Sequence, residues 1–150
     1  MYEEERTDGG GAAESRSAQS QLVGTWKLVL FQDRNSPTDP WQNDFGDPPL
    51  GYFMYDATGH ASIQIMKTPP VQISSDGPTP EQALEIFNGY IAYFGTYEVD
   101  ESQKLIVHHV EGGLNPNDIN SNQPRPFELT GDKLIIGDQQ TWIRILQRVG

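Results

Sequence analysis

The sequence has no cysteine, few basic residues and no long hydrophobic run. Without cysteine, the chain cannot form a disulfide, a thiolate metal site or a cysteine nucleophile. The net charge of -11 argues against binding to nucleic acid or to an anionic membrane surface, because both need concentrated Lys and Arg. No apolar stretch approaches the ~20 residues that cross a bilayer, and no secretory signal is visible. We therefore expect a cytoplasmic protein.

The length of 150 residues is typical of a single domain. Residues 1–21 are acidic, contain a Gly run and have no apolar periodicity, so they are predicted to form a disordered tail. Residues 22–148 are predicted to form the folded domain. The loop at residues 35–49 is rich in Pro, Gly, Asp and Asn, which excludes a helix or a central strand there.

The folded region consists mainly of short segments in which apolar and polar residues alternate, as they do in half-buried strands. Eight such segments are joined mostly by tight turns, and they lie at residues 22–32, 50–55, 60–67, 93–100, 104–112, 125–130, 133–137 and 141–147. An open sandwich and a closed barrel are both possible. The barrel is favoured, because closure removes the exposed edges of these apolar strands. The predicted fold class is an all-β, eight-stranded antiparallel barrel.

One helix is predicted between the third and fourth strands. Thr79 can cap its first turn, Pro80 suits that turn, and Gln82 completes a capping box. Apolar residues then recur at helical spacing, which predicts a helix from Pro80 to about Ala92 with an apolar face packed on the domain. We expect this helix to cover or flank the mouth of the barrel.

Several segments resemble the bacterial and fungal lipocalin-like domain family of the calycin superfamily. Gly24-Thr25-Trp26 and Trp142-Ile143-Arg144 look like its signature positions, and the more specific segments are residues 49–66, 93–100, 107–112 and 125–129. The resemblance covers residues 22–146. It implies a barrel open at one end, with a cavity for a small, mostly apolar molecule. It also implies that Trp26 plugs the closed end beneath Arg144, in a cation–π contact.

The segment LIVHHVEGG contains two of the three histidines side by side. Successive residues of a strand point to opposite faces, so the two cannot both enter the barrel and are poorly placed to bind one metal. No metal site is expected. The more apolar face of this predicted hairpin should line the lumen, and it comprises Tyr97, Val99, Ile106, His108 and Val110. His109 should point outward, although a one-residue bulge would reverse this.

An inward His108 has two interpretations. It is either a core histidine bonded to Tyr97 or to a buried water, or a group that exchanges a proton with a bound molecule. In the second case, Tyr97 or Tyr93 would donate to a developing oxyanion. No phosphate loop, nucleophile elbow or dinucleotide fingerprint occurs, so no cofactor is expected.

Three further residues are candidate ligand contacts beside Tyr93, Tyr97 and His108. Tyr55 and Gln64 share the more polar face of the hairpin at residues 50–67, whose core face is predicted to comprise Tyr52, Met54, Ala61, Ile63 and Ile65. A cavity lined by mixed groups would still admit them. Arg125, between two prolines, either anchors a carboxylate at the mouth or pairs with an acidic neighbour.

The first functional hypothesis is the binding of a small hydrophobic or amphipathic metabolite in the lumen. The alternative is a cofactor-independent cyclase, isomerase or dehydratase acting on a natural-product-type substrate in the same cavity, with His108 and Tyr97 as its catalytic residues. A third possibility is a filled barrel that works through its outer surface, where Phe31 and Met66 are predicted to lie. The oligomeric state and the ligand are left open.

Overall fold

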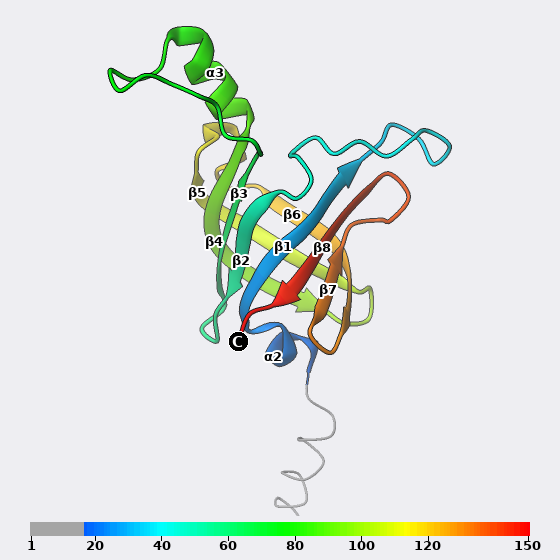
Figure 1. The fold of residues 1–150 in the computed structure, drawn as a ribbon. Helices are drawn as coiled ribbons and strands as arrows, with labels where there is room; N and C mark the ends of the chain where they lie inside the picture. Colours follow the sequence, from blue (N-terminus) through cyan, green and yellow to red (C-terminus); the bar gives the residue numbers. More distant parts are fainter. Residues whose placement is uncertain (1–16) are drawn as a thin grey trace, which may run out of the picture.

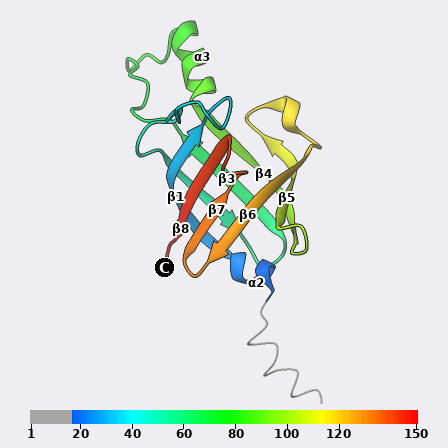
Figure 2. The same ribbon diagram turned by 90° about the vertical axis from the view of Figure 1, so that its right-hand side faces the viewer.

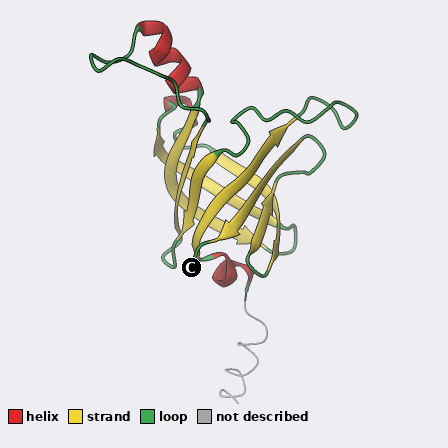
Figure 3. Ribbon diagram, viewed as in Figure 1, coloured by secondary structure: helices red, strands yellow, loops and turns green. Residues whose placement is uncertain are grey.

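The computed structural model describes residues 17–150, and they form one closed antiparallel barrel in the order β1 to β8 (Figures 1 and 3). Each strand pairs with the next in the sequence, and β8 closes the barrel against β1. The predicted eight-stranded barrel is therefore confirmed. The strands are β1 Gly24–Asp33, β2 Leu50–Tyr55, β3 His60–Met66, β4 Tyr90–Asp100, β5 Leu105–Gly113, β6 Asn122–Thr130, β7 Lys133–Ile136 and β8 Trp142–Arg148.

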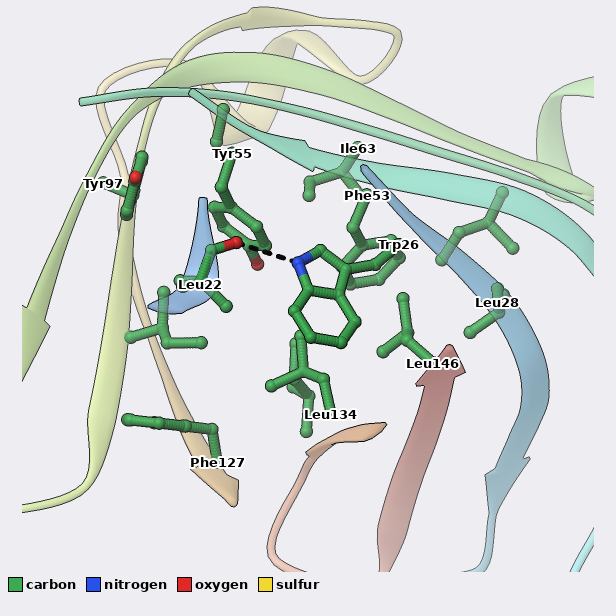
Figure 4. Close-up of a cluster of buried hydrophobic side chains, with 14 of the residues drawn as sticks. Leu22, Trp26, Leu28, Phe53, Tyr55, Ile63, Tyr97, Phe127, Leu134 and Leu146 are labelled. Atoms are coloured by element: carbon green, nitrogen blue, oxygen red, sulfur yellow. Dashed lines mark hydrogen bonds between the residues drawn. The ribbon is translucent and has the colours of Figure 1, made fainter. Parts of the chain in front are cut away.

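The closed end of the barrel is sealed by the short helix α2, Ala18–Leu22. Leu22, its last residue, and Trp26 on β1 are both buried, and the Trp26 indole N–H donates to the Leu22 carbonyl oxygen at 2.8 Å (Figure 4). The guanidinium of Arg148 lies 4.3 Å from the centre of the Trp26 ring. This corrects the predicted pairing with Arg144, because Arg148 is the residue of β8 that lies opposite Trp26 in the register.

Helix α2 also changes the predicted boundary of the tail. Its Ser17 cap accepts a hydrogen bond from the Ser20 amide, and Ala18 packs against the core, so the ordered chain begins before Leu22. Residues 1–16 of the predicted tail lie outside the described residues. No helix in the described part is both long and apolar enough to cross a membrane.

The two faces of the β2–β3 hairpin differ from the prediction in one strand. Phe53 and Tyr55 point inward with Ile63, whereas Tyr52 and Met54 are exposed. The reason is the length of the loop that joins β2 to β3. Tyr55 is opposite Ala61, and not opposite His60 as a four-residue loop would require, so every residue of β2 is turned to the other face. Of the predicted ligand contacts, Tyr55 therefore enters the lumen.

A bulge between Leu28 and Leu30 has a similar effect in β1. Phe31, which was predicted to face outward, is 3% exposed and lies in the core. By contrast, β4 and β5 pair without a shift from Gly95 to Asp100, and His108 and Val110 face inward as predicted. At Gly95 the strands lie so close that a Cβ would meet the His109 carbonyl oxygen at 1.9 Å, which only glycine avoids.

Helix α3, Pro80–Asn88, has the predicted capping box at Thr79 and Gln82 but ends four residues earlier than predicted. It does not cover the mouth. The helix and the loop before it project away from the barrel, beyond the end opposite α2 (Figures 1 and 2). None of its residues is buried, and Leu84 is 61% exposed. The apolar face of helix α3 therefore contributes little to the core.

Replacing Leu84 by Ser should change the free energy of unfolding by no more than about 0.5 kcal/mol, because the side chain is already in water. The matched replacement of Leu134, which is fully buried, should cost several kcal/mol. Urea denaturation of both variants measures the difference. A large loss of stability in the Leu84 variant would show that helix α3 packs on the barrel.

Candidate functional site

A cavity of about 190 Å³ occupies the open half of the barrel. This volume is slightly more than that of engineered cavities that bind benzene, so it admits a small ring or a short chain. Its walls are mostly aliphatic and aromatic, with two arginines among them. The lining residues are Phe31, Phe53, Ile63, Ile65, Ile91, Tyr93, Arg125, Ile136, Trp142 and Arg144.

Beside this cavity lies a buried chain of three polar side chains. His108 on β5 is 1% exposed and, apart from the buried tyrosines, is the only buried polar or charged residue in the described part of the protein. Its Nε2 lies 2.8 Å from the Tyr55 hydroxyl oxygen on β2, and its Nδ1 lies 2.6 Å from the Tyr93 hydroxyl oxygen on β4. Both imidazole nitrogens are therefore hydrogen-bonded, which satisfies a polar group that would otherwise be costly to bury.

His108 is neutral in the folded protein. Burial lowers its pKa to about 3, and the positive charge of Arg125 acts in the same direction. Burial also raises the pKa of Tyr55 and of Tyr93, although the charge of Arg125 opposes part of the rise at both hydroxyls. At neutral pH the three groups consequently form a neutral chain joined by two hydrogen bonds.

The two arginines at the cavity differ in how their charge is balanced. Arg144 forms an ion pair with Asp33 at 3.1 Å and stacks 3.4 Å from the centre of the Phe31 ring. Arg125 donates to the amide oxygen of Gln123 and lies 5.5 Å from the Trp142 ring centre. Within residues 17–150 it has no ion pair.

The structure brings together four of the six predicted site residues. Tyr55, Tyr93 and His108 form the buried chain, and Arg125 lines the cavity with Tyr93. Two others lie elsewhere. Tyr97 is buried, but its hydroxyl donates to the Asp56 carbonyl oxygen at 2.8 Å, and Gln64 is on the outside of the barrel, where it accepts a hydrogen bond from Tyr90.

Sequence reasoning missed three residues of the cavity wall, which are Phe31, Trp142 and Arg144. Arg144 was predicted to lie at the closed end, Trp142 was named only as a signature position, and Phe31 was predicted to face outward. Their positions follow from the bulge in β1 and from the β1–β8 register, neither of which has a clear signal in one sequence. His109 points away from the lumen and its Nδ1 contacts the Asn122 side chain oxygen at 2.8 Å. No cluster of metal-ligating side chains occurs among residues 17–150.

The depressed pKa of His108 predicts a pH-dependent stability. An unfolded histidine takes up a proton below about pH 6.5, whereas the folded one resists protonation down to about pH 3. The contribution of neutral His108 to the free energy of unfolding should thus be complete above about pH 6.5. It should decline as the pH falls, by up to about 1.4 kcal/mol per pH unit. Urea denaturation at pH 7 and pH 5 measures this loss. A His108→Asn variant should lack it, and an equal loss in both proteins would contradict the assignment.

Comparison with known proteins identifies the family to which this chain belongs. A model of the lipocalin-like domain matches residues 23–147. Among solved structures, a mutant of the fluorescent protein UnaG is similar at 12% sequence identity and a TM-score of 0.39, over 87% of this chain and 97% of that one. A comparison with curated protein sequences finds no match. Because the family model spans most of the chain, this protein belongs to the lipocalin-like domain family.

Proposed function

We propose that this protein binds a small hydrophobic or amphipathic molecule in the cavity at the open end of its barrel. The observation that carries the proposal is an apolar cavity with a few convergent polar groups inside a lipocalin-like barrel. Helix α3 does not cover the open end of the barrel, so it does not block the entry of a ligand there. The charge of -11 supports a small-molecule partner over nucleic acid or an anionic membrane. The cytoplasmic location stays a prediction.

A cofactor-independent cyclase, isomerase or dehydratase is the second candidate function. One feature favours it, which is that Tyr93 lines the cavity and is hydrogen-bonded from behind by His108. In such an enzyme Tyr93 would touch the substrate, and His108 would exchange a proton only through Tyr93. This differs from the predicted pair of His108 and Tyr97, because neither of those side chains lines the cavity.

The binding proposal is tested with variants that fill or spare the cavity. Ile91→Trp places a large ring in the cavity wall, whereas Met54→Trp places the same ring on the outside, where Met54 is 47% exposed. A panel of single-ring and short-chain molecules should bind to the wild type and to the Met54 variant, and the Ile91 variant should bind at least tenfold more weakly. Equal affinity in all three proteins would exclude this cavity as the site.

Incubation with a small-molecule extract distinguishes the two candidate functions. Mass spectrometry follows the compounds that the protein retains and those that it changes. One compound retained unchanged at about one molecule per protein supports binding alone. A compound consumed far beyond the amount of protein, with an isomeric or dehydrated product, supports the enzyme.

A further inference from the structure

The direction of the hydrogen bonds along the buried chain can be worked out from Tyr55. Its side chain is 1% exposed, and the His108 Nε2 is the only hydrogen-bond partner of its hydroxyl among the described residues. If Nε2 carried the imidazole proton, the Tyr55 O–H would be buried without an acceptor, which is unfavourable. The Tyr55 hydroxyl therefore donates to Nε2.

This assignment fixes the remaining bonds. A neutral imidazole has one N–H, so the proton of His108 is on Nδ1 and is donated to the Tyr93 oxygen at 2.6 Å. Tyr93 then accepts from His108, and its own O–H is left to donate. No acceptor for that O–H occurs among the described side chains or backbone groups, and Tyr93 lines the cavity. Each bond of the chain also polarises the next one in the same direction.

The charges around this hydroxyl favour an anion beside it. Arg125 acts on the Tyr93 hydroxyl as a positive charge and as a hydrogen-bond donor to its oxygen, Arg144 acts on it as a positive charge, and Asp118 acts on it as a negative charge. Arg144 is balanced by Asp33 at 3.1 Å. Arg125 lines the same cavity and, within residues 17–150, has no carboxylate in ion-pair distance. Tyr93, whose O–H has no acceptor, and Arg125, whose charge is not balanced, therefore line the same small cavity.

We propose that the cavity selects small molecules that carry an anionic oxygen of the phenolate or enolate type. The oxygen accepts the O–H of Tyr93 and pairs with Arg125, while the apolar body of the ligand packs against Ile91, Ile136 and Trp142. This inference rests on the proposed binding function and adds the chemical class of the ligand. The chain from Tyr55 through His108 holds Tyr93 as a donor, so all three residues contribute to the selectivity.

The test uses 4-nitrophenol, whose ionisation changes its visible absorbance, and 4-nitroanisole, a neutral ring of similar size. On the wild-type protein the apparent pKa of bound 4-nitrophenol should fall, and the phenolate should bind about tenfold or more tightly than 4-nitroanisole, as expected for a hydrogen bond to a charged group. Arg125→Met and Tyr93→Phe should each remove most of this preference, so that the phenolate and 4-nitroanisole bind with similar affinity. Lys27→Met, which removes an exposed charge on β1, should retain the preference for the phenolate.

The outcomes separate this inference from the binding function. If 4-nitroanisole binds as tightly as the phenolate and the absorbance shows no shift, the anion selectivity is overturned while the cavity remains a binding site. If neither probe binds, the proposed function itself fails for ligands of this size. Circular dichroism confirms that each variant is folded, and Tyr93→Phe, which keeps the ring, supplies the result if Arg125→Met does not fold.

Discussion

Replacing Trp26 by Ala is expected to lower the free energy of unfolding by about 3 to 5 kcal/mol, which is the usual cost of removing a large buried aromatic ring. Trp26 has no exposed surface and lies in the core cluster at the end of the barrel that helix α2 closes. The change also removes the hydrogen bond to the Leu22 carbonyl and the ring beneath Arg148. Helix α2 has five residues and is too short to be stable without this contact, so it should fray as well.

The matched control is Trp41→Ala. Trp41 lies in the loop after β1 and is partly exposed, with the guanidinium of Arg34 stacked 3.9 Å from its ring centre. An exposed contact of this kind contributes only about 0.5 to 1 kcal/mol. Urea denaturation of both variants, together with amide exchange at residues 18–22, measures the difference. Equal losses of stability in the two variants would mean that Trp26 does not seal the barrel.

The number and order of strands could be predicted from the sequence because each strand carries its own alternating pattern. Which face points inward could be predicted only where no residue is inserted. From Gly95 to Asp100 and along the paired part of β5 the register is regular, and His108 was placed correctly. In β2 and in the second half of β1, one extra residue in a turn or a bulge reversed the faces of Phe53 and Phe31.

The partners of His108 depend on closure of the whole barrel and could not be predicted from local pattern. Tyr97 is the direct cross-strand neighbour of His108, which made it the expected partner. Its ring instead packs edge-on against Tyr55 at 4.9 Å between centres, and its hydroxyl reaches the β2–β3 turn. Tyr55 comes from 53 positions earlier in the chain and approaches His108 across the lumen. Such a contact has no signal in the spacing of residues.

The packing of helix α3 could not be predicted from local pattern either. Its capping box depends on neighbouring residues and was predicted correctly from Thr79 and Gln82. Whether its apolar face packs on another surface depends on the path of the chain before and after the helix. The loop before the helix and strand β4, which follows it directly after Gly89, place the helix away from the barrel, so a regular apolar spacing was not evidence of burial here (Figure 2).

Replacing His108 by Leu should lower the free energy of unfolding by about 2 to 4 kcal/mol, although the new side chain is apolar and of comparable size. The reason is that two buried hydroxyl groups, those of Tyr55 and Tyr93, lose their hydrogen-bond partner together, at about 1 to 2 kcal/mol each. His109→Leu is the matched control, because it is the neighbouring residue on the outer face. It should change the stability by no more than about 0.5 kcal/mol.

A second substitution separates lost hydrogen bonds from poor packing. In the wild type, Tyr55→Phe should destabilise the protein by about 1 to 2 kcal/mol, because it leaves Nε2 of His108 without a donor. In the His108→Leu background the same change should stabilise it, because the hydroxyl that it removes has no partner there. A double-mutant cycle by urea denaturation measures this reversal of sign. If Tyr55→Phe has the same effect in both backgrounds, the two residues are not coupled, and the donor direction assigned to Tyr93 loses its basis.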